Sequence, residues 1–333
     1  MTDRFSPLSA QSRALLRREP LPAFVKPMLA TLTEARFSDP HWLFERKWDG
    51  VRCLAFRAAD GTVLLRSRND QPLERTYPEV AEALARQSRA EAVLDGEIVS
   101  FEGRRTSFER LQGRMGLTDP DAARASGVAV YYYVFDVLHL DGHDVRALPL
   151  RDRKRLLRDA ADFTDPLRFT AHRNAAGEEE YRKACARGDE GVIAKRADAR
   201  YVSGRSGDWL KFKCVRDQEL VIAGYTAPKG TRVGFGALLV GYHADGEFVY
   251  AGKVGTGFDT SVLRSLQQRM QQLEVSAPPF TRGRVRERDV HWVRPELVAQ
   301  IGFTEWTRDG MLRHPRYLGL RTDKPAAEVI REN

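Results

Sequence analysis

The chain has 333 residues, 42% hydrophobic and 30% charged, which excludes a disordered or fibrous protein and allows two globular domains. Lysine and arginine outnumber aspartate and glutamate by 54 to 46, and this positive balance favours a polyanionic partner such as nucleic acid. The three cysteines, Cys53, Cys185 and Cys214, are odd in number, lie far apart in the chain and form no Cys-x-x-Cys pattern. They argue against both a zinc module and a disulfide framework.

Residues 1–21 form a polar, arginine-rich lead-in with a short predicted helix over 10–18, to which we assign no chemistry. The start of the chain lacks the uninterrupted apolar core of a signal peptide, and no apolar run in the sequence is long enough to span a membrane. We therefore expect a cytoplasmic protein with no membrane partner.

Residues 22–216 mix strands and helices irregularly. Strands are predicted over 51–56, 62–67, 92–101, 128–140, 191–196 and 209–215. Helical patterns cover 78–89, 107–115, 151–161 and 177–188. Because several strands follow one another without a crossover helix, the order favours an α+β domain with antiparallel sheets.

Residues 217–333 change to short strands with hairpin turns. Strands are predicted over 219–226, 236–255 and 297–307, with a helix over 262–274. Asp245-Gly246 is a strong hairpin signal, and Asp259 or Thr260 is the expected helix cap. This pattern predicts a small β-barrel of the OB type, a common platform for nucleic acid.

Charged residues gather at the ends of the predicted strands. The stretch FERKWDGVR places Lys47 and Asp49 beside the strand over 51–56, where burial of either charge is costly. Read alone, Lys-x-Asp-Gly is a charged turn, and the functional alternative is a nucleophilic lysine. In WLKFK, Lys211 and Lys213 alternate along a strand and share one face, which alone would be a solvated lysine face.

Further charged motifs follow in the order SRND, LDGE, VFD, DEGVIAKR and WLKFK. This series resembles the covalent nucleotidyltransferase superfamily of ATP-dependent DNA ligases, RNA ligases and capping enzymes, whose first motif is Lys-x-Asp-Gly-x-Arg. The stretch RHPRYLGLRTDK also resembles the last motif of that family. The stretches KWDGVR, DEGVIAKR and YVSGRSGDWLKFK are similar to the ligase domain of bacterial non-homologous end-joining ligases.

The resemblance implies a nucleotidyltransferase domain of ATP-grasp-like ligase type over 22–216 and an OB-fold domain over 217–333. It implies an ATP-dependent DNA ligase that seals 5′-phosphate and 3′-hydroxyl ends through a lysyl-AMP intermediate and a 5′-adenylated DNA, in double-strand-break repair by end joining. The alternatives are an RNA ligase or a GTP-using capping enzyme, and a nucleic-acid-binding OB protein without catalysis.

The resemblance also implies roles for the charged residues. Lys47 is the nucleophile, and it needs neighbouring cations or a metal to favour its neutral amine. Lys211 and Lys213 would neutralise the α-phosphate of the nucleotide. Asp49 and Glu190 are the candidate ligands of Mg²⁺ or Mn²⁺, with Asp49 in a supporting role or orienting Lys47.

The nucleotide contacts follow from the same match. Glu97 corresponds to the ribose contact, and Glu45 to the adenine contact, a role that its backbone can fill. Phe135 corresponds to the aromatic ring that stacks on adenine, with core packing as the alternative. The remaining candidates are cations that would hold ribose, phosphate or the pyrophosphate leaving group: Arg52, Arg68, Lys195, Arg316 and Lys324.

The expected substrates and partners are ATP, Mg²⁺ or Mn²⁺, and duplex DNA with nicks or breaks. A Ku-type end-binding protein and separate polymerase or phosphoesterase proteins are implied by the resemblance alone. We expect a monomer associated with the nucleoid. The stretch TRGRVRER is a basic surface loop that could contact phosphate, with a solvated charge run as the commoner interpretation.

Overall fold

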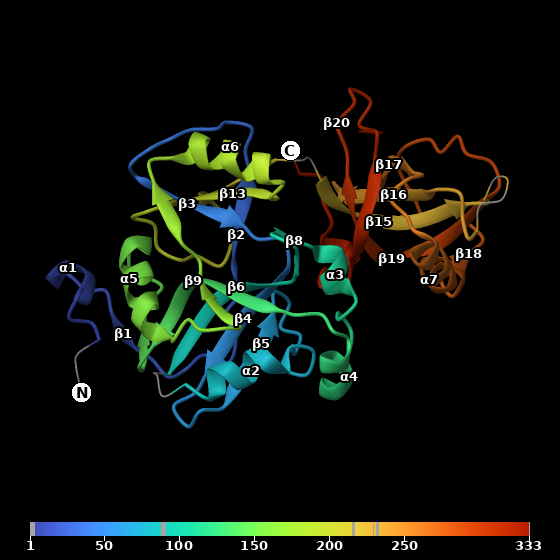
Figure 1. The fold of residues 1–333 in the computed structure, drawn as a ribbon. Helices are drawn as coiled ribbons and strands as arrows, with labels where there is room; N and C mark the ends of the chain where they lie inside the picture. Colours follow the sequence, from blue (N-terminus) through green and yellow to red (C-terminus); the bar gives the residue numbers. More distant parts are fainter. Residues whose placement is uncertain (1–3, 88–90, 215–216, 229, 231–232, 333) are drawn as a thin grey trace. The chain divides into compact units, whose positions relative to one another are not determined.

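The computed structural model describes residues 4–87, 91–214, 217–228, 230 and 233–332. It contains two compact units, Met1–Cys214 and Val215–Asn333. Residues 215 and 216, where the sequence puts the domain boundary, lie outside the described residues. Figure 1 labels the elements of both units and colours them along the chain, from blue at the N-terminus to red at the C-terminus.

The N-terminal unit contains two main sheets (Figure 1). The larger sheet has the order β1 (Arg17–Arg18), β10 (His143–Asp144), β9 (Tyr131–Leu140), β6 (Ala92–Val99), β4 (Val51–Arg57), β5 (Val63–Ser67), with β11 (Leu167–Phe169) beside β9. The smaller sheet has the order β12 (His172–Asn174), β3 (Trp42–Lys47), β13 (Gly191–Arg196), β14 (Gly204–Lys213), β2 (Met28–Leu32). Most neighbouring strands are antiparallel, as predicted, but β11 with β9 and β14 with β2 are parallel.

The helices of this unit are α1 (Ala10–Arg13), α2 (Pro78–Ala85), α3 (Phe108–Gln112), α4 (Pro120–Ala125), α5 (Leu150–Ala160) and α6 (Gly177–Arg187), with a small hairpin of β7 (Phe101–Glu102) and β8 (Arg105–Thr106). The predicted helix over 10–18 is wrong in its second half, because Arg17 and Arg18 pair with β10 as a strand. The sequence also missed α4, which begins with Pro120 after the N-cap Asp119. The predicted end of α2 at residue 89 lies outside the described residues.

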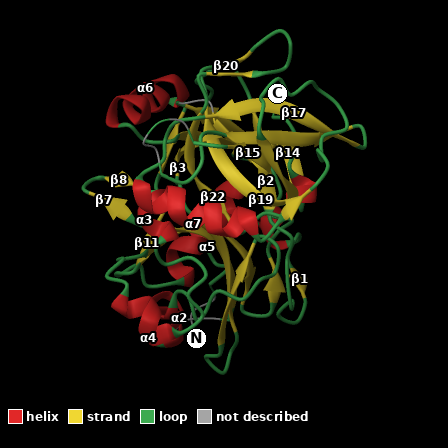
Figure 2. Ribbon diagram, turned by 90° about the vertical axis from the view of Figure 1, so that its right-hand side faces the viewer, coloured by secondary structure: helices red, strands yellow, loops and turns green. Residues whose placement is uncertain are grey.

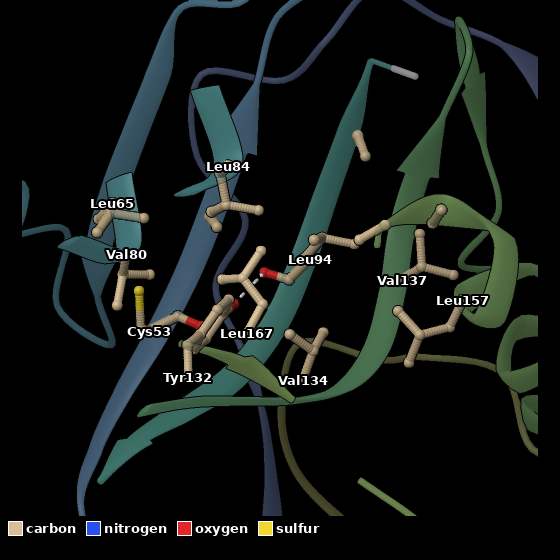
Figure 3. Close-up of a cluster of buried hydrophobic side chains, with 14 of the residues drawn as sticks. Cys53, Leu65, Val80, Leu84, Leu94, Tyr132, Val134, Val137, Leu157 and Leu167 are labelled. Carbon is tan, nitrogen blue, oxygen red and sulfur yellow. Dashed lines mark hydrogen bonds between the residues drawn. The ribbon is translucent and has the colours of Figure 1, made fainter. Parts of the chain in front are cut away.

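Side-chain alternation decides what each sheet face contacts. One face of the larger sheet packs against α2 and α5 in a core that includes Cys53, Leu94 and Tyr132 (Figure 3). The buried Tyr132 hydroxyl donates to the carbonyl oxygens of Cys53 (2.9 Å) and Leu94 (3.0 Å). Gly96 is required beside this ring, since an added Cβ would lie 2.5 Å from it.

A second core fills the space between the two sheets. Leu54 and Phe56 of β4 meet Phe135 of β9 and Trp209 of β14 there, and all four are buried. The other face of the smaller sheet buries Phe44 and its neighbours under α6. The smaller sheet is therefore covered on both faces, and polar side chains between the sheets need specific partners.

The cysteines correct one expectation. Cys185 in α6 and Cys214 after β14 form a disulfide with a Cα–Cα distance of 5.2 Å, whereas Cys53 is free and buried. The sequence argued against a disulfide framework because these cysteines are far apart in the chain. Packing of α6 on the smaller sheet brings this one pair together.

The C-terminal unit is an antiparallel sheet with the order β17 (Glu247–Val254), β16 (Leu238–Ala244), β15 (Asp217–Thr226), β19 (Val290–Gly302), β18 (Glu274–Val275), and β22 (Arg316–Arg321) beside β19. It also contains α7 (Thr260–Gln271), the hairpin of β20 (Glu305–Trp306) and β21 (Leu312–Arg313), and the short helix η1 (Ala326–Glu328). Figure 2 shows these strands in yellow and α7 in red.

The local signals for this unit are confirmed. Asp259 is the N-cap of α7, and its carboxylate accepts a 2.8 Å hydrogen bond from the amide of Val262. Asp245 and Gly246 both have positive φ between β16 and β17, as a hairpin turn requires. No helix in the described part of either unit is long and apolar enough to cross a membrane.

Candidate active site

Strand register places the predicted lysines together on the smaller sheet. Lys47 at the end of β3 lies opposite Gly191 of β13, which lies opposite Lys213 of β14. In a neighbouring row Glu45 lies opposite Ile193, which lies opposite Lys211. Because directly opposed residues point to the same face, Lys47, Lys211 and Lys213 share the face toward the larger sheet.

Gly191 shapes the row that contains Lys47. Its φ is +150°, and an added Cβ would lie 1.9 Å from the carbonyl oxygen of Phe212. No side chain fits at this position, so only glycine allows β13 to pair this closely with β14 in the row between Lys47 and Lys213.

Lys47 forms an ion pair with Glu190, the residue directly before β13. Both side chains are largely enclosed, at 19% and 15% exposure. The other carboxylate oxygen of Glu190, Oε2, is buried and accepts no hydrogen bond from the described residues. Asp49 lies half-buried in the connection from β3 to β4, two residues after Lys47.

The carboxylates near Lys47 fit a cation of limited protein coordination. The described residues contain no group of three or more histidine, cysteine, aspartate or glutamate side chains arranged to hold a metal. Mg²⁺ is commonly bound by one or two carboxylates together with water and substrate phosphates. The unsatisfied Oε2 of Glu190, with Asp49 close in sequence to Lys47, matches that mode of binding.

A second pair of charges lies directly beside the first. Arg46 precedes Lys47, and its guanidinium lies 2.7 Å from the carboxylate of Asp189, which precedes Glu190. Burial lowers the pKa of Arg46, and Asp189 opposes this effect. The same guanidinium lies 4.5 Å from the centre of the Trp48 ring, which stacks on Tyr133 at 3.7 Å. The backbone around Lys47 is therefore fixed by contacts that the sequence analysis did not identify.

Arg52 is held by a residue that the motif analysis passed over. Its guanidinium donates two hydrogen bonds of 2.6 Å to Asp95, in the LDGE stretch. The Tyr201 hydroxyl donates to the same carboxylate at 2.7 Å. Burial lowers the pKa of Arg52, but the charge and hydrogen bonds of Asp95 outweigh it, so the pKa lies above its ordinary value. The predicted clamp role of Arg52 stays a prediction. The available signal for Asp95 was its place in the LDGE stretch, two residues before the candidate Glu97.

The neighbouring candidates Glu97 and Arg68 lie near Arg52. Glu97 of β6 is directly opposite Arg52 in the register of the larger sheet. Arg68 follows Ser67, which is opposite Cys53, so it lies at the same end of that sheet. The structure thus gathers these three candidates at one sheet end, and their contacts with a nucleotide stay predictions.

Glu45 is buried between two lysines. Its carboxylate oxygens lie 2.8 Å from Nζ of Lys154 and 2.6 Å from Nζ of Lys195, and all three side chains are 2% exposed. Burial raises the pKa of Glu45, but the two lysines outweigh it and the pKa lies below its ordinary value. Burial lowers the pKa of Lys195. Lys195 therefore faces Glu45 in this structure, and its predicted phosphate contact stays a prediction.

Lys154 is a site-lining residue that the sequence analysis missed. It lies on α5 at a position of the buried face, between Leu150 and Leu157. Besides Glu45, its Nζ donates to the carbonyl oxygen of Thr170 at 2.8 Å. A lysine on the apolar stripe of an amphipathic helix was the signal that could have identified it.

Phe135 is 7% exposed within the core between the sheets. Nζ of Lys195 and Cζ of Arg52 lie over its ring, 4.1 Å and 4.7 Å from the centroid. Adenine stacking on Phe135 stays a prediction, and it requires a ring face that these cations leave available.

The two candidates in the C-terminal unit differ in their surroundings. Arg316 begins β22 and is exposed. Lys324 is enclosed, and its Nζ lies 3.0 Å from the carboxylate of Glu219. The adjacent Asp323 accepts two hydrogen bonds from Arg321, of 2.9 Å and 2.7 Å.

Two facing sheets with an enclosed Lys47–Glu190 pair, followed by an antiparallel unit of the OB type, define a nucleotidyltransferase ligase domain joined to an OB-type domain. Residues 27–213 match the family model of the ATP dependent DNA ligase domain, and residues 231–324 match that of the ATP dependent DNA ligase C terminal region. The chain belongs to the ATP-dependent DNA ligase family.

Individual relatives agree with this assignment and confirm the predicted superfamily and fold class. The chain is 37% identical over 323 residues to the multifunctional non-homologous end joining protein LigD of Pseudomonas aeruginosa, covering 95% of this chain and 37% of that protein. A similar protein of Mycobacterium tuberculosis is 37% identical over 315 residues, covering 92% of this chain and 40% of the relative. The chain therefore spans about two fifths of the length of these curated relatives.

A solved structure is also similar over nearly its full length. The structure described as mycobacterial DNA ligase D complexed with ATP and MES is 34% identical, with a TM-score of 0.65. The similarity covers 92% of this chain and 98% of that one. The architecture described above is thus that of a ligase domain.

Proposed function

We propose that this chain is an ATP-dependent DNA ligase that joins 5′-phosphate and 3′-hydroxyl ends in duplex DNA during end-joining repair. The observation that carries the proposal is the enclosed Lys47–Glu190 pair on the sheet face that also carries Lys211 and Lys213. Family membership and the similarity to end-joining proteins support the substrate class.

The first step is transfer of AMP to Lys47. The neutral amine attacks the α-phosphorus of ATP, a P–N bond forms, and the bond to pyrophosphate breaks while the amine loses a proton. Lys211 and Lys213 stabilise negative charge at the phosphate from the same sheet face. Glu190 holds Lys47 in place before the reaction, and Mg²⁺ or Mn²⁺, when bound, supplies positive charge beside the phosphates.

Two further steps complete the joining. A 5′-phosphate oxygen of DNA attacks the same phosphorus, the P–N bond breaks, and Lys47 regains its proton. The 3′-hydroxyl then attacks the 5′-phosphate of the adenylated DNA, which forms the phosphodiester bond and releases AMP. We further propose that a Ku-type protein and separate polymerase or phosphoesterase proteins act with this monomeric chain at the nucleoid.

Incubation of the purified chain with α-labelled ATP and Mg²⁺, followed by nicked duplex, tests this proposal. Wild type should acquire label and pass it to DNA. Lys47→Ala lacks the amine and Lys47→Arg carries a guanidinium that stays protonated, so neither variant should acquire label. Lys183→Ala on the exposed face of α6 is the matched control and should label normally. Covalent label on Lys47→Ala would contradict the site, and stable label with no sealing of DNA would contradict the reaction.

A further inference from the structure

The C-terminal unit contains a cavity of about 630 Å³ that the proposed reaction does not use. It is lined by Tyr242 and Tyr250 of the sheet, by Met311 from the β20–β21 hairpin, and by Arg282, Arg284 and Arg286. These arginines belong to the TRGRVRER stretch. The sequence allows two interpretations of this stretch: a basic loop that contacts phosphate or, more commonly, a solvated charge run.

The arginine-bearing segment is fixed on β17. The amide of Tyr250 donates to the carbonyl oxygen of Arg282 at 2.9 Å, and the amide of Thr281 donates to that of Phe248 at 2.9 Å. Gly283 has φ +102°, and an added Cβ would lie 2.8 Å from Cβ of Tyr250. Close packing and backbone hydrogen bonds therefore fix the start of this segment on β17 as far as Gly283, the residue directly before Arg284.

The charges of the cavity do not cancel one another. Arg282 is paired with Glu247 at 2.7 Å, and Glu287 is paired with Lys253 at 3.2 Å. Arg284 and Arg286 are exposed and have no carboxylate partner among the described residues. Asp309 is the remaining acid of the lining.

With Arg282 and Glu287 paired, the two unpaired guanidinium groups exceed the one unpaired carboxylate. The cavity therefore carries net positive charge. Guanidinium groups bind phosphate oxygens through paired hydrogen bonds, so the expected ligand is anionic.

The wall of the cavity adds apolar and aromatic surface. Tyr242, Tyr250, Val249 and Met311 all contribute to it, and the two tyrosines, which are 6% and 4% exposed, present only a small part of their rings. A space of this size suits one small ligand and excludes the width of a DNA duplex. Aromatic surface beside cations is the usual arrangement for a single nucleic acid strand, because every base has a face that can stack.

We propose that this cavity binds an unpaired nucleotide of single-stranded DNA, as found at an overhanging end, through Arg284 and Arg286. The inference rests on the proposed function for its substrate class. It goes beyond that function by assigning a separate site that recognises unpaired ends instead of the reacting phosphate.

Fluorescence anisotropy of the full chain with labelled oligothymidylate tests the proposal. The double variant Arg284→Ala/Arg286→Ala should bind about tenfold more weakly, with the salt slope reduced by about 1.4 for two lost phosphate contacts on a single strand. Asp309→Asn should bind more tightly, because it removes the opposing charge. Arg264→Ala/Arg269→Ala on α7 removes the same charge from exposed positions of the same unit and should change binding less than twofold.

Sealing of a nick in fully paired duplex separates this inference from the proposed function. The Arg284/Arg286 variant should seal such a nick and react with ATP at the wild-type rate. Equal loss of oligothymidylate binding in the α7 control, or no loss in the cavity variant, would overturn the site. Loss of the reaction with ATP in the cavity variant would also overturn it, by assigning the cavity to the triphosphate. A wild type that binds oligothymidylate but seals no nick would contradict the proposed function alone.

Discussion

Lys47 and Glu190 form an ion pair where β3 ends and β13 begins, although most of the N-terminal unit separates them in sequence. Direct pairing of Lys47 with Gly191 in the sheet places Glu190 at this point. The carboxylate holds the lysine and leaves Oε2 without a hydrogen bond from the described residues. We therefore predict that Glu190 acts on both the nucleophile and a cation.

Glu190→Gln should slow formation of the AMP adduct by about 10- to 100-fold and raise the Mg²⁺ concentration needed for half the maximal rate. The amide keeps the shape but loses the charge that a cation requires. Titration of Mg²⁺ in the labelling assay measures both effects, with Glu179→Gln on the exposed face of α6 as the control. An unchanged Mg²⁺ requirement would show that Glu190 only orients Lys47.

Asp95→Asn should destabilise the N-terminal unit by about 3 kcal/mol or more, because it leaves the enclosed Arg52 without its anion. Tyr201→Phe removes one hydrogen bond to the same carboxylate and should cost about 1 kcal/mol. Urea denaturation followed by tryptophan fluorescence compares the two variants. An equal loss in the free energy of unfolding for the two variants would mean that the charge of Asp95 contributes little beyond a neutral hydrogen-bond acceptor.

Phe135→Ala should lower stability by about 3–5 kcal/mol, since the ring is buried between the two sheets. It should also weaken the use of ATP, whereas Phe135→Leu and Phe135→Tyr should retain much more of both properties. Thermal unfolding and the ATP dependence of adduct formation distinguish the two roles. Normal ATP binding in all three variants, together with lowered stability, would leave Phe135 as a core residue only.

Arg316→Ala should slow the reaction with ATP by about tenfold or more while changing stability by less than about 0.5 kcal/mol, because Arg316 is exposed. Adding Lys324→Ala should cost additional stability through loss of the Glu219 pair. Both variants should seal a nick that already carries AMP on its 5′-phosphate, since no pyrophosphate leaves in that step. Equal losses in the two assays would point to DNA binding instead.

His172 should make the stability of the chain depend on pH. Burial, together with the positive charge of Lys154, lowers the pKa of His172 from 6.5 to about 4. Between these values the unfolded chain binds a proton that the folded chain does not, so stability is lost as pH falls from 6.5 toward 4 and is fully present above 6.5.

The melting temperature measured from pH 7.5 down to 4.5 tests this effect. His172→Asn removes the titrating group, so its melting temperature should fall less over this range than that of the wild type. Parallel curves for the two proteins would show that His172 does not contribute.

Local sequence patterns were sufficient for several features of the molecule. Alternation along WLKFK predicted one shared face for Lys211 and Lys213, and the strand register agrees. Asp259 and the Asp245-Gly246 turn predicted a helix start and a hairpin, because caps and turns depend on neighbouring residues. The order of the charged motifs likewise predicted the family that the comparisons show.

Which side chains pair with one another depended on the tertiary structure. The sequence does not show which residue Asp95, Lys154 or Glu190 pairs with. The resemblance names Glu190 only as a candidate metal ligand, and a charged residue looks the same in a sequence whether it is buried or solvated. Their roles follow from which sheet faces meet, which brings Asp95 to Arg52 and Lys154 to Glu45. The Cys185–Cys214 disulfide has the same origin, in the packing of α6 on the smaller sheet. Short-range patterns determine elements and their faces, whereas long-range packing determines which faces oppose one another and so which charges pair.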